Sequence, residues 1–297
     1  MEARIEKLLF AATRAPSGEN AQPWHFTVQA QGDKTTIDVR IAEERDSSLY
    51  NWGNRASYLA LGAAIENMKI AAPGVHLDLT IALTPDANDP LCGASIVCRE
   101  ATEAVPDPCA PFIEKRATNR KPYAGTPLSS QEKSALCEAA DPEAQLVLIE
   151  DGPMIRALAE AGSANEQIML GNPILHRFFF EHVNWSRAED EEKKVGFFID
   201  TLELPPPARM GFKVMRDWRR ARVLNRLGMN SFVATQNASL YATAPAFGII
   251  RVQEESVRSA IKTGMSLQRI WLTAESCGLS LQPLTGILFF ALRLRAG

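Results

Sequence analysis

The amino-acid sequence predicts an α+β fold built from two similar lobes in one chain, with a helical insertion in the second lobe. Three observations lead to this prediction. Segments with apolar residues at helical spacing are followed by segments in which apolar and polar residues alternate, the pattern of helices packed on half-buried strands. Two helical segments far apart in the chain can be aligned without a gap. Residues 167–236 fit neither pattern.

The first lobe, residues 1–110, is predicted to combine two helices with four strands. An apolar helical pattern runs from Ile5 to Thr13 and stops before Pro16. The turn Gln31-Gly32-Asp33 separates two β-like runs and indicates a hairpin. In order along the chain, the further elements are strands over residues 24–29 and 35–42, a helix over 56–72 ended by Pro73-Gly74, and strands over 75–83 and 94–98.

The second lobe, residues 111–297, follows the same alternation. Ser129-Ser-Gln-Glu132 is a capping-box pattern, and the helix that it opens should end at Asp141-Pro142. A later helix is expected to stop at Gly278. The expected elements are strands over residues 145–149 and 246–252, a helix beginning over 154–161, the long helix over 256–277, and a final apolar strand over 287–294.

The insertion, residues 167–236, changes in character. It carries many charges, a break at Pro205-Pro206-Pro207, and aromatic residues without clean periodicity. We expect an inserted helical excursion or lid with no independent core.

An internal repeat supports the two-lobe prediction. Gly62 to Ala72 aligns with Gly264 to Ala274, glycine on glycine and apolar on apolar. Helices with small residues at one end can approach closely and pack as a pair. The repeat therefore predicts an internal pseudo-dimer, although any two buried helices share such a pattern, and that alternative stays open.

Composition excludes several classes of protein. With 32 basic and 35 acidic residues, the net charge of −3 gives no surplus for binding nucleic acid. Five cysteines without a CxxC pair favour a reducing compartment. No apolar run approaches the roughly 20 residues of a membrane helix, and the charged N-terminus is not a secretory signal. We therefore expect a cytoplasmic protein with no membrane partner. Four histidines without paired-ligand spacing predict no metal site.

Two polar segments suit a planar ligand that carries a phosphate. The loop from Pro16 to Trp24 offers short donors and acceptors for a ring edge such as that of a flavin, and the alternative is an ordinary turn. The segment from Arg116 to Tyr123 holds three cations in six residues, and arginine forks suit phosphate oxygens. Its alternative is a solvated basic loop, and Pro122 makes a turn as plausible as a helix. The candidate residues are Pro16, Ser17, Asn20, Gln22, Arg116, Thr118 and Arg120.

A third segment follows the second long helix, at Pro283, Leu284, Thr285 and Gly286. It would present backbone groups to a flat ring, or it would simply connect a helix to a strand. Arg293 and Arg295, two apart in the predicted strand, should point to the same side and add to an anion pocket.

Together these segments resemble the FMN-dependent nitroreductase family. The run Pro16-Ser17-x-x-Asn20-x-Gln22-Pro23-Trp24 is similar to the family's flavin loop. Arg116-x-Thr118-x-Arg120 is similar to its Arg-x-Ser-x-Arg phosphate motif, and Pro283 to Gly286 to its isoalloxazine-facing segment. The likeness extends to the fused, two-lobe branch, which includes nitroreductase-like domains beside ThiF-like adenylating domains. Where many members carry an acidic residue facing the flavin, this chain has Thr285.

The resemblance implies one FMN per chain, held between the lobes, because each half of the motif set occurs once. It implies an FMN-binding oxidoreductase that passes hydride from NAD(P)H to a nitroaromatic, quinone or similar small acceptor. No dedicated catalytic side chain is expected, since the chemistry belongs to the flavin. Two alternatives stay open. One is a flavoprotein that sequesters FMN with little turnover. The other is a non-catalytic scaffold, for which a ThiF-like adenylating protein is the candidate partner. The internal pseudo-dimer would remove the need for an oligomer.

Overall fold

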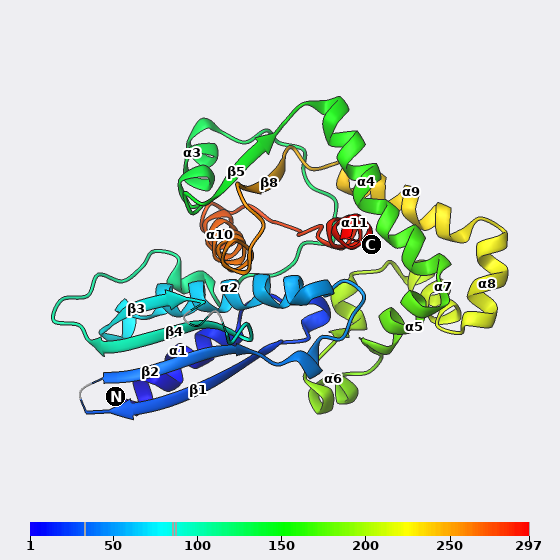
Figure 1. The fold of residues 1–297 in the computed structure, drawn as a ribbon. Coiled ribbons are helices and arrows are strands. Elements are labelled where there is room, and N and C mark those ends of the chain that lie inside the picture. Colours follow the sequence, from blue (N-terminus) through cyan, green and yellow to red (C-terminus); the bar gives the residue numbers. More distant parts are fainter. Residues whose placement is uncertain (33, 85, 87, 297) are drawn as a thin grey trace.

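Two helices cross at the centre of the molecule. The computed structural model describes residues 1–32, 34–84, 86 and 88–296. In Figure 1, helices α2 (Arg55–Ala71) and α10 (Val257–Ser276) lie between a four-stranded sheet on one side and a two-stranded sheet on the other. A group of shorter helices extends from one end. The architecture is mixed α and β with antiparallel main sheets, which is compatible with the predicted α+β class.

The N-terminal sheet has the strand order β1-β2-β4-β3, and each neighbouring pair is antiparallel. Its inner face packs on helices α1 and α2, where Leu8, Ile37, Ile65 and Ile96 are fully buried. The predicted helices and strands are confirmed with small shifts at their ends, and Asp33 of the predicted turn lies outside the described residues. The bounds are α1 (Glu2–Thr13), β1 (Trp24–Gln31), β2 (Lys34–Ile41), β3 (Leu77–Leu83) and β4 (Cys92–Glu100).

The second sheet pairs two strands that are about 100 residues apart in sequence. Strand β5 (Ala144–Ile149) lies antiparallel to β8 (Phe247–Val252), beside α3 (Ser130–Glu138) and α10. The predicted capping box is confirmed at the start of α3. The Ser129 hydroxyl accepts from the Glu132 N–H at 3.2 Å, and the Glu132 carboxylate accepts from the Ser129 N–H at 2.6 Å.

Helices α2 and α10 approach so closely that their backbones touch at two glycines. A Cβ on Gly62 would overlap the carbonyl of Ile261, and a Cβ on Gly264 would overlap the carbonyl of Leu59. Each glycine therefore faces the carbonyl of the residue three positions before the glycine of the other helix. Only glycine permits this approach, since any Cβ would occupy the space of the facing carbonyl.

The polar contacts between the two helices follow the same reciprocal rule. The Gln268 amide donates to Asn67 Oδ1 at 2.7 Å, and the Arg269 guanidinium donates to Glu66 Oε1 at 2.7 Å. In the sequence alignment Glu66 matches Gln268, and Asn67 matches Arg269. Gln268 therefore contacts the residue that follows its match, and Arg269 contacts the residue that precedes its match. Both buried side chains on α2 are thereby hydrogen-bonded, as buried polar groups require.

The helical insertion packs around an aromatic cluster that Tyr50, Phe289 and Phe290, from outside the insertion, help to complete. Within the insertion, Leu175, Phe180, Met215 and neighbouring rings fill the space between its helices. Short helices that pack at different angles do not need apolar residues at one common spacing, and this is why the aromatic residues show no clean periodicity. The elements are α4 (Gly152–Gly171), α5 (Pro173–Glu181), β6 (Val183–Asn184), α6 (Arg187–Lys193), β7 (Phe197–Phe198), α7 (Pro206–Met215), α8 (Trp218–Arg226) and α9 (Met229–Tyr241).

The C-terminal segment is a helix, α11 (Gly286–Ala296), so the predicted final strand is wrong. Phe289 and Phe290 pack against the aromatic cluster, and the Phe289 N–H donates to the Thr285 carbonyl at 3.1 Å. A helix satisfies its own backbone groups, whereas a strand needs a neighbouring sheet edge. The expectation that Arg293 and Arg295 point to the same side is wrong for the same reason, because residues two apart point to different sides of a helix.

Among the described residues, no helix combines the length and hydropathy that crossing a membrane requires.

Candidate functional site

The loop between α1 and β1 is held in an unusual backbone conformation. Glu19, Asn20 and Gln22 all have φ between 46° and 53°, the left-handed region that non-glycine residues rarely adopt. The Ser17 hydroxyl accepts from the Gln22 N–H at 3.0 Å, which closes the loop. Strained backbone of this kind persists only where surrounding structure enforces it, and it is common at binding sites.

Arg116 lies at the base of this loop. Its Nη2 donates to the carbonyl of Arg14 at 3.1 Å, two residues before Pro16, and its guanidinium stacks over the Trp271 ring at 4.4 Å. Burial lowers the pKa of Arg116 to about 10, partly offset by Glu275, so the side chain stays charged at neutral pH. The first and second predicted segments are therefore neighbours in space.

Arg120 and Thr118 connect the arginine segment to other parts of the molecule. Arg120 Nη1 donates to the Thr201 carbonyl in the insertion at 3.0 Å, and burial lowers its pKa against the opposing effect of Glu203 and Tyr241. Thr118 forms a parallel bridge with Leu281, just before the third predicted segment. The segment is extended here, so its arginines do not share a helical face.

The turn from Pro283 to Gly286 packs against helix α4. A Cβ on Gly162 would lie 3.1 Å from the Leu284 side chain, and a Cβ on Gly286 would lie 2.7 Å from Asn165 Oδ1. Glycine at 286 therefore allows the turn to sit directly on the Asn165 amide. The Arg116–Arg14 contact links the first and second predicted segments, and the Thr118–Leu281 bridge links the second to the residues just before the third.

The two C-terminal arginines lie on helix α11. Arg293 donates to the Leu49 carbonyl at 3.1 Å, and Arg295 is exposed on the last turn of α11. The helix directs the two guanidiniums apart, with Arg293 held at the Leu49 carbonyl and Arg295 in solvent. Their contribution to an anion pocket stays a prediction.

Sequence reasoning missed a cluster of acids and tyrosines beside the convergent segments. The Tyr241 hydroxyl donates to Glu166 Oε1 at 3.1 Å, and burial raises the pKa of Glu166 to about 7. Burial, with nearby Asp46, also raises the pKa of Glu19 to about 7. Tyr50 lies among them, its pKa raised mainly by burial and also by Glu19 and Glu166.

Only Glu19 could have been found in the sequence, because it stands inside the loop motif. Glu166 and Tyr241 lie on α4 and α9, far from every motif, and no spacing connects them. Their side chains become a pair only because the two helices pack together. The pair leaves Glu166 Oε2 buried without a hydrogen-bond partner among the described residues.

Contacts from the insertion occupy two of the predicted ligand donors. Gln22 Nε2 donates to the Lys194 carbonyl at 2.7 Å, as Arg120 does to Thr201. The stretch 194–201 therefore lies across both the loop and the arginine segment. A ligand that used these two donors would have to replace both carbonyls.

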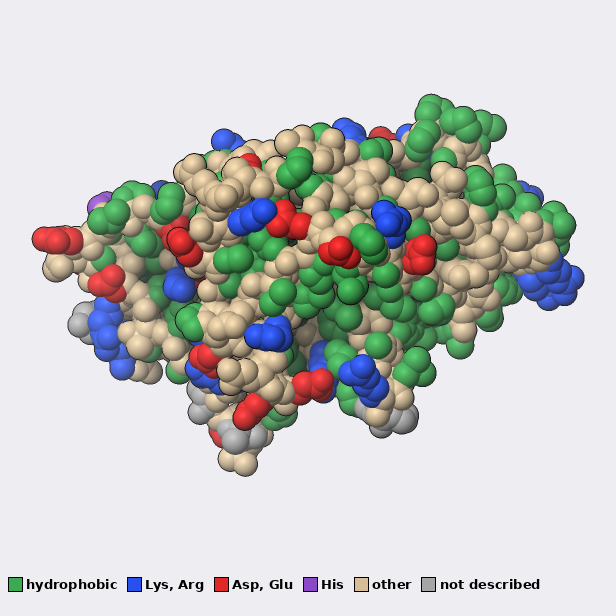
Figure 2. Space-filling view, turned by 90° about the horizontal axis from the view of Figure 1, so that it is seen from above, with side chains coloured by type: hydrophobic (Ala, Val, Ile, Leu, Met, Phe, Trp, Pro, Cys, Tyr) green, Lys and Arg blue, Asp and Glu red, His purple; other side chains and the backbone are tan. Residues whose placement is uncertain are grey.

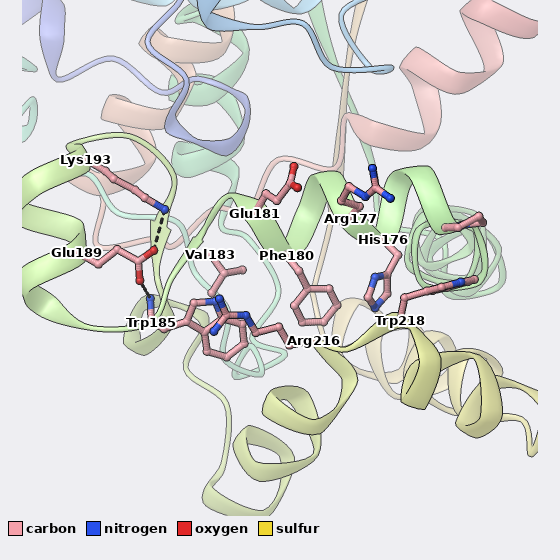
Figure 3. Close-up of a pocket in the computed structure, with 11 residues that line it drawn as sticks. His176, Arg177, Phe180, Glu181, Val183, Trp185, Glu189, Lys193, Arg216 and Trp218 are labelled. Atoms are coloured by element: carbon pink, nitrogen blue, oxygen red, sulfur yellow. Dashed lines mark hydrogen bonds and ion pairs between the residues drawn. The ribbon is translucent and has the colours of Figure 1, made fainter.

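A separate cavity of about 400 Å³ lies within the insertion and contains none of the predicted site residues. Figure 3 shows Arg216 over the Trp185 ring, with Phe180 and His176 along the same wall. Lys193 pairs with Glu189, which also accepts from the Trp185 backbone N–H. Because His176 Nε2 bonds the Met215 carbonyl at 2.7 Å, this histidine has a structural role.

No group of three or more His, Cys, Asp or Glu side chains in the described part of the chain could hold a metal ion.

Comparison with known proteins gives distant relatives, and no protein-family model matches the chain. MT1398 of Mycobacterium tuberculosis is 26% identical over 288 residues, 95% of this chain and 38% of MT1398. The Serratia protein PigM, named a probable NAD(P)H nitroreductase, is 23% identical over 304 residues, 96% of this chain and 80% of PigM. The M. tuberculosis protein acg, also named as an NAD(P)H nitroreductase, is 27% identical over 180 residues, 59% of this chain and 53% of acg.

The chain thus spans 38% of MT1398 and about half of acg. The two relatives named as NAD(P)H nitroreductases are similar to this chain at 23% and 27% identity.

Proposed function

We propose that this protein is an FMN-binding oxidoreductase in which hydride from NAD(P)H passes through one flavin to a nitroaromatic, quinone or similar small acceptor. The contact between Arg116 and the Arg14 carbonyl carries the proposal. It joins the phosphate-type arginine segment to the base of the loop that begins at Pro16. The distant relatives named as nitroreductases support the same reaction class.

Buried polar atoms without partners support the proposal of a bound cofactor. Among the described residues, Arg116 Nε, Asn165 Oδ1 and Glu166 Oε2 are inaccessible to water and make no hydrogen bond. Leaving such atoms unpaired costs about 1–3 kcal/mol each. A bound group with phosphate oxygens and ring N–H donors would supply the missing partners. The three atoms lie on the arginine segment and on α4 beside the Gly286 turn.

Each element has a distinct role in the proposed site. Arg116 and Arg120 would hold the phosphate, with Thr118 between them. The hydroxyl and amides of Ser17, Asn20 and Gln22 would meet the polar edge of the ring. The turn Pro283, Leu284, Thr285 and Gly286 would approach the ring with its backbone. The flavin supplies hydride transfer when it is bound. The chain supplies orientation, positive charge at the phosphate and, at Glu166, a carboxyl that holds a proton up to about pH 7.

We assign the two lobes to residues 1–110 and 111–297, with residues 167–236 as the insertion or lid. In an interface with two-fold symmetry, a contact from position i to position j is repeated from j to i. The contacts of Gly62 and Gly264 follow this rule and support an internal pseudo-dimer. One flavin per chain follows, since each half of the motif set occurs once.

The stretch 194–201 bears on both turnover and sequestration of FMN. The Lys194 and Thr201 carbonyls occupy the donors of Gln22 and Arg120, so a flavin that binds through these donors must displace this stretch. A ThiF-like partner, a non-catalytic scaffold role and a cytoplasmic location stay predictions.

Absorbance of the purified protein tests the proposal. We expect a visible flavin band that NADH or NADPH bleaches and that a nitroarene or quinone restores. A flavin that neither nucleotide reduces would support sequestration, and a protein that remains colourless after incubation with FMN would contradict both. Arg116→Ala with Arg120→Ala should lower FMN affinity at least 100-fold. Arg99→Ala with Arg251→Ala is the matched control, since both arginines are exposed and distant from the motifs. Unchanged affinity in the first variant would overturn the phosphate assignment.

A further inference from the structure

The outer surface of α7 and α8 carries a concentration of positive charge that the proposed flavin site does not use. Six exposed cations lie between residues 206 and 228, where Asp217 is the sole acidic residue. Among the ion pairs that the described residues form, none includes these six. We call this surface the basic face, defined by Lys213, Arg219, Arg220, Arg222 and Arg226; the sixth cation, Arg216, lies over the Trp185 ring beside the insertion cavity and is not part of it.

The orientation of the basic face is fixed by packing. Met215 and Ala221, on the inner sides of α7 and α8, are buried in the aromatic cluster. The Asp217 carboxylate caps α8 by accepting from the Arg219 N–H at 2.8 Å. Because the inner sides are held in this way, the arginine side chains of α8 must point outward. Figure 2 shows basic side chains gathered at the end of the molecule formed by α8.

Exposed apolar side chains are interspersed with these cations. Met210 is 72% exposed, Val223 52% and Leu227 80%. Leu227 precedes Gly228, whose φ of 90° turns the chain sharply, and Phe232 follows on α9 at 58% exposure. The α8–α9 corner thus projects large apolar groups beside arginines. Exposed apolar side chains that gather into a patch rimmed by polar residues mark protein or membrane interaction sites.

The remainder of the chain makes this concentration distinctive. Acidic residues outnumber basic ones in the whole sequence, 35 to 32. Positive charge is therefore gathered locally and does not reflect a basic protein. A local field of one sign attracts an extended surface of the opposite sign.

We propose that the basic face docks peripherally on an anionic lipid bilayer. The arginines would pair with headgroup phosphates, while Leu227, Phe232 and Met210 enter the boundary between headgroups and acyl chains. Basic amphipathic helices bind membranes in this manner, and their affinity depends on anionic lipid and buried apolar area together. Phosphate groups of nucleic acid would satisfy the arginines and leave the apolar corner exposed. The proposal revises the expectation of no membrane partner, requires no spanning helix and does not depend on flavin binding.

Flotation with vesicles tests the proposal. The full chain is mixed with vesicles of phosphatidylglycerol and phosphatidylcholine in equal parts, and with vesicles of phosphatidylcholine alone. We expect at least ten-fold tighter binding to the anionic vesicles, weakening as salt rises. Binding to neither vesicle, or equal binding to both, would overturn the proposal.

Two variants separate the charged and apolar contributions. Arg219→Glu with Arg222→Glu should lower vesicle binding at least ten-fold, because these exposed side chains face the bilayer and form no ion pairs with described residues. Leu227→Ser with Phe232→Ser should lower it about five-fold at unchanged net charge. Full binding by either double variant would contradict the docking geometry. Tighter binding to duplex DNA than to anionic vesicles, unaffected by Leu227→Ser, would assign the face to nucleic acid instead.

The matched control is Arg99→Glu with Arg251→Glu, which changes net charge equally on strands β4 and β8. It should retain vesicle binding to within about two-fold. An equal loss in this control would show that total charge governs binding and would overturn the assignment to α7 and α8. Circular dichroism of each variant establishes that the fold is intact.

Discussion

The N-terminal sheet and the helical insertion bury their apolar side chains in different ways. In the sheet, Ile37 and Ile96 alternate with outward residues and are fully inaccessible to solvent. In the insertion, Phe180, Trp185 and Phe212 pack ring against ring, and the Trp185 indole N–H is buried without a partner among the described residues. A regular backbone imposes a regular pattern, whereas aromatic rings can fill spaces between short helices at many angles.

This difference teaches that the two regions should respond differently to the same kind of change. The sheet and the α2–α10 pair form one continuous core, so damage there should affect the whole fold. The insertion packs mainly on itself and lies over the candidate flavin site through a few hydrogen bonds. It should open locally before the rest unfolds.

Truncation of one core residue in each region is the strongest test of the comparison. Ile96→Ala and Phe180→Ala should each remove about 4 kcal/mol of local packing free energy. For Ile96→Ala, we expect the whole urea transition to shift to lower concentration. For Phe180→Ala, we expect faster hydrogen exchange in residues 167–236 and nearly unchanged exchange in the sheet. Equal loss of protection in both regions would show that they unfold as one unit.

Glycine-to-alanine changes should have opposite signs in the two regions. In Gly264→Ala, the new methyl would overlap the Leu59 carbonyl, and separating the helices should cost about 3 kcal/mol. Gly211 lies in α7 with no atom within 4 Å of an added Cβ, so Gly211→Ala should stabilise that helix by about 0.5–1 kcal/mol. Thermal melting of the two variants measures both changes in stability. A Gly264→Ala protein as stable as the parent would refute the close approach of α2 and α10.

The buried carboxyl of Glu166 should make stability depend on pH. Its pKa is raised from 4.5 to about 7 in the folded protein, so the folded state binds more protons than the unfolded state between these values. The free energy of unfolding should therefore fall as pH rises from about 4.5 to 7, by about 3 kcal/mol for this group. Glu166→Gln cannot ionise and should reduce that slope, and the remaining slope should come from Glu19, whose pKa is also raised to about 7. Urea unfolding at pH 5 and pH 8 measures the difference.

Glu2→Gln is the control for the pH experiment, because Glu2 is exposed at the start of α1. Its unfolding should keep the parent's pH slope. An unchanged slope in Glu166→Gln would mean that this carboxyl is ionised in the folded protein.

The smallest expected effect concerns the contact that holds the insertion over the loop. Gln22→Ala removes the hydrogen bond to the Lys194 carbonyl, worth about 1 kcal/mol. Trypsin cleavage after Lys193 and Lys194 should then be about five-fold faster under native conditions. Gln29→Ala, on an exposed position of β1, is the control and should leave the cleavage rate unchanged. Identical rates in both variants would show that Gln22 does not restrain the insertion.

Much of the fold was predictable because its signals are local. The Ser129 capping box, the stop at Pro73 and the alternation around Ile37 each act over a few residues. The final segment was not predictable in this way, because Phe289 and Phe290 suit either a strand or a helix. In the folded chain both rings pack on the aromatic cluster as part of α11, a tertiary contact that no local pattern in the sequence predicts.

The candidate site likewise contains residues that the sequence could identify and residues that only the fold brings together. The loop at Ser17 and the arginines at 116 and 120 could be selected from residue types and spacing alone. Arg293 and Arg295 were included through an incorrect secondary structure. The Glu166–Tyr241 pair was invisible because no sequence rule connects α4 with α9.

By itself, the sequence determined most helices and strands before the C-terminal segment and the matched glycines of α2 and α10, and it selected the polar segments that we propose hold a phosphate-bearing ring. The tertiary structure alone decided that Arg116 meets the base of the Pro16 loop, that the insertion lies across it and that Glu166 is buried. The reason is physical. Backbone preference acts between near neighbours in the chain, whereas burial and the pairing of distant charges depend on which surfaces the folded chain brings together.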